Sequence, residues 1–257
     1  MEILNQIYSQ IQSKIAVYET IAAKVNNISP EAAKRVISGE LEAYLNRLSV
    51  YLNANQGSNI SLVQGCNIFL EVIQSGLSFS PIANHVYVSR LKGTGTSIGY
   101  KVTADGEIFQ AQRSGAISHL SEPVLVVEGE QFSITVSPDG RHQAQHNISF
   151  NGRPKFSLDT FMVGYVYVIY PTGDRELHWI SAERMKELRA KSQNPAMYND
   201  ESFVQTKVIK HALRKVRKTP FTNQGQIGEA EEESLNAREF EETPIPSTGF
   251  ENNNEPF

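Results

Sequence analysis

The sequence predicts an α+β fold, with N-terminal helices, a central antiparallel sheet, C-terminal helices and a disordered acidic tail. Three observations predict it. Apolar residues recur at three- and four-residue steps through the first third of the chain, apolar and polar residues alternate in the middle, and helical periodicity returns after residue 181. The 257 residues are 40% hydrophobic, which supports one sizeable core plus appendages.

The first third is predicted to hold three helices. Apolar residues from Ile3 to Val25 form one stripe, which predicts a single amphipathic helix over about residues 3–25. Ser29-Pro30-Glu31 has the order of N-cap, first-turn proline and first-turn acid, so a second helix begins there and runs to about Leu52. A third helix is expected over about residues 60–74, ending near Gly76.

The middle of the chain is predicted to be rich in strands. The expected strands cover residues 85–91, 97–102, 123–128, 131–136, 161–170 and 175–180. Turn residues separate consecutive pairs of these strands, so we expect three hairpins, one of them around Glu128-Gly129-Glu130. The segment 137–155 is polar, with two prolines and two glycines, and is predicted to be a loop.

A basic helix is predicted near the end of the folded part, after a helix that Ser181 caps and that covers about residues 182–192. The segment 203–218 has six basic residues and no acidic one. At about 100° per residue, five of these bases lie on one arc and the apolar residues on the opposite arc. One face is expected to dock on the core while the other presents a row of cations that matches phosphates. The alternative is an ordinary solvated helix face, although such faces usually mix charges of both signs.

Charge divides the chain into two parts. Residues 221–257 contain nine acids and one base, a net charge of −8, whereas residues 1–220 have a net charge of +4. The tail also lacks periodicity, which predicts disorder. We therefore expect a helical region at 1–55, an α+β core at 56–220 and a disordered acidic tail at 221–257.

The sequence makes no positive case for an enzyme, a cofactor or a metal site. His142 and His146 have the spacing of a zinc motif but lack its glutamate and lie in the predicted loop. The glycines at 93, 95 and 99 fall within a hairpin, not between a strand and a helix, and no phosphate-binding lysine motif occurs.

A cytoplasmic location is expected from three features. Cys66 is the only cysteine, and its apolar helical context predicts a buried structural thiol in a reducing compartment. The N-terminus lacks the charged start and apolar core of a signal peptide. No apolar run approaches the roughly 20 residues that cross a bilayer, so no membrane association is expected.

Flat side chains near basic residues are candidates for stacking on nucleic-acid bases, since single strands need both cations and rings. Tyr100 lies beside Lys101, and Trp179 precedes four bases of the next predicted helix. The alternative is that both rings belong to the core or the face of the sheet.

Several short segments, read in order, resemble the RecT family of phage and bacterial single-strand annealing proteins over about residues 30–220. They are Gln74-Ser75-Gly76-Leu77, Asn84-His85-Val86-Tyr87, Ile98-Gly99-Tyr100-Lys101, Arg113-Ser114-Gly115, Val127-Glu128-Gly129-Glu130-Gln131-Phe132, a tyrosine-rich strand, Glu183-Arg184-Met185 and the basic segment 206–215. About four extra residues around 103–107, and Ser89 where the family often has proline, mark a divergent member.

The resemblance implies an α+β core with a short twisted sheet packed by helices. It also implies ATP-independent binding of single-stranded DNA and annealing of complementary strands in homologous recombination, in the cytoplasm of a bacterial host. The protein would form an oligomeric ring or filament through its N-terminal helices, retain the annealed duplex and work with a partner 5'-3' exonuclease. We predict that the DNA groove contains Tyr100, Lys101, Arg113, Arg189, Lys191, Lys207, Lys210, Arg214 and Lys215.

The tail suggests a further partner. Acids before Pro256 and Phe257 resemble the C-terminal tip of bacterial single-stranded DNA-binding protein (SSB), which implies recruitment of proteins that bind that tip. The alternative is a solubilising tail that shields the basic face. Two other hypotheses stay open for the whole chain: a passive coating protein that does not anneal, and a structural oligomer in which the basic helix contacts the tail.

Overall fold

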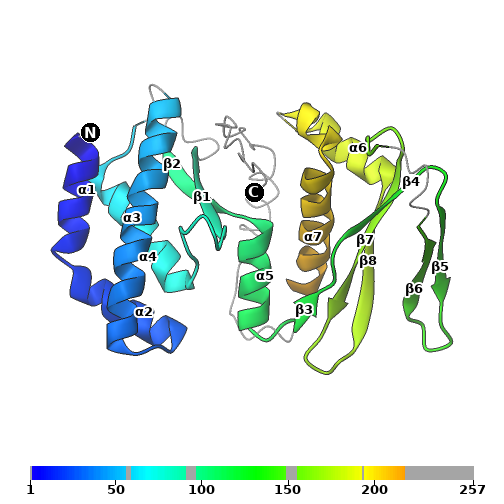
Figure 1. The fold of residues 1–257 in the computed structure, drawn as a ribbon, viewed down its shortest axis with the longest axis horizontal. Helices are drawn as coiled ribbons and strands as arrows, with labels where there is room; N and C mark the ends of the chain where they lie inside the picture. The colour runs from blue at the N-terminus through cyan, green and yellow to red at the C-terminus, as the bar shows by residue number, and fades with distance from the viewer. Residues whose placement is uncertain (1, 56–58, 91–96, 149–154, 193, 218–257) are drawn as a thin grey trace, which may run out of the picture.

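The computed structural model describes residues 2–55, 59–90, 97–148, 155–192 and 194–217, and it confirms the α+β prediction (Figure 1). From the N-terminus the elements are α1 (Glu2–Gln12), α2 (Ile15–Asn26), α3 (Pro30–Ala54), α4 (Leu62–Ser75), β1 (Val86–Arg90), β2 (Ile98–Val102), α5 (Ala104–Arg113), β3 (His119–Leu120), β4 (Val124–Val127), β5 (Gln131–Val136), β6 (His142–Asn147), β7 (Phe161–Ile169), β8 (Arg175–Ser181), α6 (Ala182–Ala190), the 3-10 helix η1 (Pro195–Asn199) and α7 (Glu201–Arg217). Within these ranges, none of the helices combines the length and the apolar character needed to cross a membrane.

The predicted single helix over 3–25 is wrong, because the chain turns at Ser13-Lys14 between α1 and α2. The hydroxyl of Ser13 donates to the carbonyl of Gln10, and the amide of Lys14 donates to the carbonyl of Ile11 instead of continuing the helical ladder. Both helices contact α3 and α4, so the turn lets each lay its apolar stripe on that pair. The apolar residues keep their helical spacing across this turn, so the sequence pattern does not reveal that the helix breaks there.

The predicted starts and stops of the next two helices are confirmed. The Ser29 hydroxyl accepts the amide hydrogen of Ala32 at 3.2 Å, and Pro30 occupies the first turn of α3. Helix α4 ends at Gly76, whose φ of 69° lies in the left-handed region that favours glycine.

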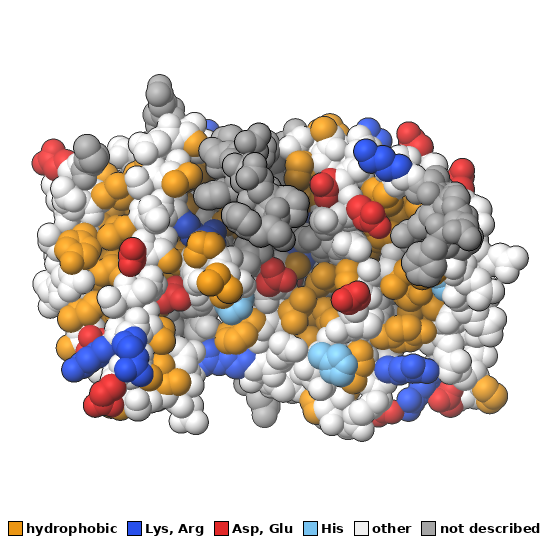
Figure 2. Space-filling model, in the orientation of Figure 1, with side chains coloured by type: hydrophobic (Ala, Val, Ile, Leu, Met, Phe, Trp, Pro, Cys, Tyr) orange, Lys and Arg blue, Asp and Glu red, His pale blue; other side chains and the backbone are white. Residues whose placement is uncertain are grey.

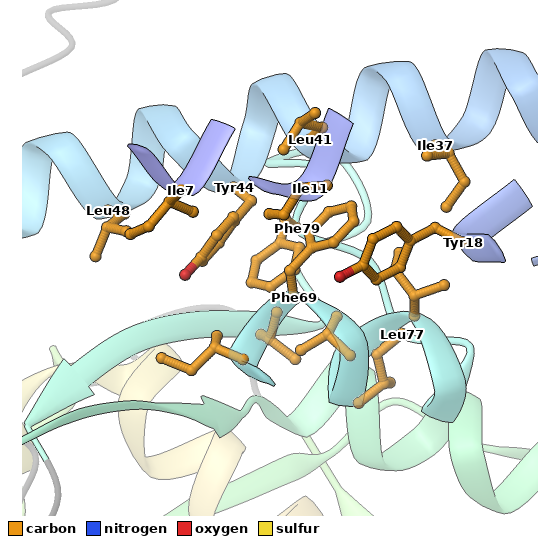
Figure 3. Packing of buried hydrophobic residues seen from close by; sticks show 14 of the residues in the cluster. Ile7, Ile11, Tyr18, Ile37, Leu41, Tyr44, Leu48, Phe69, Leu77 and Phe79 are labelled. Carbon is orange, nitrogen blue, oxygen red and sulfur yellow. The ribbon is translucent and has the colours of Figure 1, made fainter. Parts of the chain in front are cut away.

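A cluster of aromatic rings fills the core between these helices (Figure 3). Phe69 of α4 is fully buried, and its ring centroid lies 5.2 Å from that of Tyr18, 5.6 Å from Tyr44 and 6.1 Å from Phe79. The Tyr44 hydroxyl donates to the carbonyl of Gly65 at 2.8 Å, so its one polar atom is satisfied inside the core.

The predicted hairpin of the first two strands is confirmed, since β1 and β2 pair antiparallel with Val88 opposite Tyr100. Its buried residues Val86, Val88 and Ile98 belong to the same hydrophobic cluster as α1–α4. The Gln64 side chain of α4 donates to the Ile98 carbonyl, which ties the hairpin to the helices.

The second core is built on a sheet in which β7 is central. Strand β8 pairs along one edge of β7, and β3 and β4 pair along the other, all antiparallel. The predicted strands 161–170 and 175–180 and their turn are thereby confirmed. Helix α7 covers one face of this sheet, and the β5–β6 hairpin packs on the other (Figure 1).

The predicted hairpin between 123–128 and 131–136 is wrong. Strand β4 pairs with β7, and β5 pairs with β6, which lies inside the predicted loop. The turn at Gly129, with φ of 91°, leads the chain away from the sheet, and the Glu130 carboxylate accepts the amide hydrogen of Val127 there. Strand β6 was missed because its sequence, HQAQHN, has polar residues on both faces.

Helix α5 was also missed by the sequence analysis. Thr103 caps it by accepting the amide hydrogen of Gly106 at 3.1 Å. A Cβ atom at Gly106 would lie 2.3 Å from the carbonyl oxygen of His85, so only glycine lets α5 begin this close to the strand. Helix α5 consequently lies between the β1–β2 hairpin and α7 (Figure 1).

Candidate nucleic-acid interface

The apolar arc of α7 docks on the sheet, as its periodicity predicts. Its buried residues are Val204, Val208, Ala212, Leu213 and Val216. The contact is close because Gly164 of β7 faces the helix: a Cβ atom there would lie 2.4 Å from a methyl carbon of Val208. The sheet therefore fixes which cations of α7 reach the surface.

The N-terminal half of α7 turns its cations inward. Lys207 is only 7% exposed, and its Nζ lies 4.6 Å from the centroid of the Phe203 ring. Lys210 donates to the carbonyl of Val102 at 3.2 Å, and its Nζ lies 3.7 Å from Glu107 Oε1 on α5. The expectation that all the cations form an open row is wrong for Lys207, because η1 and α5 pack against this half of the helix.

The C-terminal half of α7 brings a cation to a flat ring. Lys215 is exposed, and its Nζ lies 5.7 Å from the centroid of the Trp179 ring on β8. The ring of His142 on β6 lies 5.0 Å from the same tryptophan ring. Arg214, one residue before Lys215, is half-buried. Among the described strands β8 pairs only with β7, so it forms an edge of the sheet, and α7, β8 and β6 meet around Trp179 there.

Two buried or half-buried histidines near these cations, His211 and His178, have lowered pKa values. Burial first, and then the charges of Lys215, Arg214, His178 and Arg184, lower the pKa of His211 to about 4. His178 is 2% exposed, and burial also lowers its pKa; Glu176 acts in the opposite direction, and Lys215 lowers it further. The two imidazoles are therefore neutral at pH 7, inside a field set by cations.

We call Arg184, Arg214, Lys215, His178 and His211 the basic cluster, because the first four of these act together on the pKa of His211. The sequence did not single out Arg184 or the histidines as site residues, because β8, α6 and α7 meet only in the folded protein. Arg184 also forms a 2.6 Å ion pair with Glu187, three residues further along α6. Trp179 was weighed as a stacking ring from its position before four bases, and its ring lies beside a cation that comes from α7.

The other predicted DNA-binding residues lie elsewhere. Arg189 is half-buried in the last turn of α6, and Lys191 is exposed just after it. Tyr100 and Lys101 lie half-buried on β2, on the far side of α5 from the basic cluster (Figure 1). The Tyr100 side chain packs against the N-terminal hydrophobic cluster, as the alternative interpretation of a core tyrosine expects.

Arg113 connects the two halves of the molecule. Its guanidinium donates to the carbonyl of Val25 and, at 3.3 Å, to the side-chain oxygen of Asn26, at the C-terminal end of α2. A cation at this end of a helix is favourable because of the helix dipole. A Cβ atom at Gly76 would collide with the same guanidinium, so the segments around residues 76 and 113 contact each other here.

The structure also explains the histidine pair at 142 and 146. Both lie on β6 and face the sheet, where His142 packs on Trp179 and His146 lies 3.3 Å from the Tyr165 hydroxyl. Across the described ranges, no group of three or more His, Cys, Asp or Glu residues has the arrangement of a metal site. Pro256, Phe257 and the rest of the acidic tail lie outside the described residues.

Charges on the surface are mixed on the face shown in Figure 2. Lys and Arg side chains form several small groups there, with Asp and Glu among them, and no continuous basic surface covers it. Any attraction of this face for nucleic acid thus depends on local groups of cations, and not on a uniform field.

Lowering the pH from 7 to 5 is expected to destabilise the protein through His211. The unfolded chain, with an ordinary pKa of 6.5, takes up a proton that the folded protein binds only near pH 4, so the free energy of unfolding falls as the pH falls through this window. After allowance for solvent screening, we expect a loss of about 1–2 kcal/mol. Urea unfolding at both pH values measures it.

His211→Gln should remove the part of this dependence that arises from His211, whereas substituting the exposed His119 with Gln should leave that part in place. An equal pH dependence in the two variants would show that the loss arises elsewhere.

No protein-family model matches the sequence, and a search of curated proteins finds no relative.

Proposed function

We propose that this protein binds single-stranded DNA without ATP and anneals complementary strands, as a divergent relative of the RecT family. The observation that carries the proposal is the contact between the exposed Lys215 ammonium, in the last turn of α7, and the Trp179 ring of β8. Single-strand binding combines cations that follow the backbone with rings on which bases stack, and stacking contributes about 1–3 kcal/mol per base. The order of the family segments along the chain supports the same function.

Annealing fits this chemistry. Contacts to phosphates hold a strand but carry no sequence information, so bases stay free for pairing with a complementary strand. Base pairing then supplies the free energy, and no nucleotide hydrolysis is needed. The proposal includes a bacterial cytoplasmic setting, a partner 5'-3' exonuclease and retention of the annealed duplex.

Assembly into a ring or filament is part of the proposal. The N-terminal helices expose several large apolar side chains, namely Tyr8, Val17, Val36 and Val50. Figure 2 shows hydrophobic side chains gathered over the α1 and α3 side of the molecule. Apolar surface of this kind supports contact between subunits.

The decisive experiment follows pairing of two complementary labelled oligonucleotides with and without the protein, in the absence of ATP, over a salt series. We expect faster pairing that fades as salt rises, with log K for single strands falling by about 0.7 per phosphate contact for each tenfold rise in salt. Binding without acceleration would support the passive coating protein instead. Absence of binding at low salt would reject both and leave the basic helix as an assembly surface.

A further inference from the structure

Charge is segregated between α6–α7 and the segment that follows them. Residues 182–217 contain nine basic and four acidic residues, a net charge of +5, whereas residues 221–257 have a net charge of −8. Only three residues, 218–220, separate the two stretches. The most acidic part of the chain is therefore tethered next to its most basic part.

The point of attachment lies at the basic cluster. Helix α7 ends at Arg217, and Arg214 and Lys215 lie in its last turn. The first acidic run, Glu229 to Glu233, begins 12 residues after Arg217. A chain spans at most about 3.6 Å per residue, so this connection reaches up to about 40 Å, which covers the cluster and α6.

Two glutamates lie beside the cluster, and they face Arg184 and His178. Glu187 pairs with Arg184, and Glu176 Oε1 lies 3.6 Å from His178 Nε2, whereas the Lys215 ammonium lies over the ring of Trp179. A carboxylate beside this ammonium would add an ion pair and keep the contact with the ring. Glutamates therefore fit this position for the same reason that phosphates do.

We propose that the acidic segment 221–257 occupies the basic cluster of its own chain when no nucleic acid is bound. Tethering raises its effective concentration there to the order of millimolar, so individually weak carboxylate contacts suffice. Because exposed ion pairs weaken in salt, the contact is reversible. The docking stands independently of the proposed function, whereas its consequence, that single-stranded DNA must displace the segment, rests on that function.

The test uses the full chain and a full-length variant in which the nine glutamates of residues 221–257 are replaced by glutamine. A carbodiimide cross-links a carboxylate to a neighbouring amine through an amide bond, and mass spectrometry identifies the cross-linked residues. We expect cross-links between the tail glutamates and Lys215 at low salt, and we expect their yield to fall as salt is added. Mixing isotope-labelled and unlabelled protein distinguishes cross-links within one chain from cross-links between chains.

Trp179 supplies a second readout because it is the only tryptophan. Its emission should differ between the two proteins at low salt and converge at high salt. A synthetic peptide of residues 221–257, added to the glutamine variant, should restore the emission of the natural protein, and the same peptide with glutamine for glutamate should not. The docking would be overturned if the natural protein and the glutamine variant had the same emission and no cross-links to Lys215 formed.

Affinity for single-stranded DNA completes the test. The glutamine variant should bind about tenfold more tightly at low salt, a difference that disappears as salt rises. If all cross-links were between differently labelled chains, docking within one chain would be overturned, and the tail would bind a neighbouring copy instead. Docking without any DNA binding would reject the proposed function and leave the docking intact, so the two failures are distinguishable.

Discussion

Replacing Arg214 and Lys215 together with alanine is expected to weaken binding to single-stranded DNA about 25-fold at 0.1 M salt. Each lost phosphate contact removes about 0.7 from the slope of log K against log salt, so two contacts change that slope by about 1.4. The reason is local: Lys215 brings positive charge to the Trp179 ring and Arg214 precedes it in the last turn of α7, whereas Lys207 and Lys210 point inward. Fluorescence anisotropy with a labelled oligonucleotide over a salt series measures both quantities.

A matched control separates this local effect from net charge. Lys34 and Arg35 are adjacent, exposed cations on α3, and replacing both with alanine changes the net charge by the same amount. We expect the control to keep nearly the natural slope. Equal losses in the two variants would mean that only long-range charge matters, and an unaltered slope in the Arg214 and Lys215 variant would place the DNA elsewhere.

Phe69→Ala is expected to lower the free energy of unfolding by about 3–5 kcal/mol, because it empties a fully buried position. Three rings lie against Phe69, namely those of Tyr18, Tyr44 and Phe79 (Figure 3), and they come from three separate segments of the chain. Since these segments cannot all move inward, much of the cavity should persist. Urea denaturation followed by circular dichroism measures the loss.

The control for this prediction is Ile82→Ala. Ile82 is also a large apolar residue of the first half of the chain, but it is 97% exposed. We expect its substitution to change stability by less than about 0.5 kcal/mol. A small effect at Phe69, comparable to that at Ile82, would mean that the aromatic cluster does not hold the N-terminal helices together.

Elements specified by local chemistry were predictable. Ser29 and Ser181 mark helix starts because a hydroxyl satisfies a nearby backbone amide, and Gly76 marks a helix end because of its left-handed backbone. The β7–β8 pair was predictable because an apolar strand, a short turn and a second strand follow one another directly. In each case the information lies within a few residues.

Elements specified by distant partners were not predictable. Strand β4 pairs with β7, which lies more than thirty residues further along the chain, and not with the neighbouring β5. The start of α5 depends on the close approach of Gly106 to the carbonyl oxygen of His85, about twenty residues earlier in the chain, and no local sequence pattern reveals this contact. The break at Ser13-Lys14 depends on how α1 and α2 each meet α4.

The sequence by itself determined the α+β class, the apolar arc of α7, the excess of cations over residues 182–217 and the acidity of the tail, because composition and helical period depend only on residue order. Tertiary structure alone decided which cations face solvent. It buried Lys207 beneath η1, paired Lys210 with α5 and left Lys215 beside Trp179. The physical reason is that a helical period sorts residues by angle around one axis, whereas exposure depends on what other segments pack against each angle.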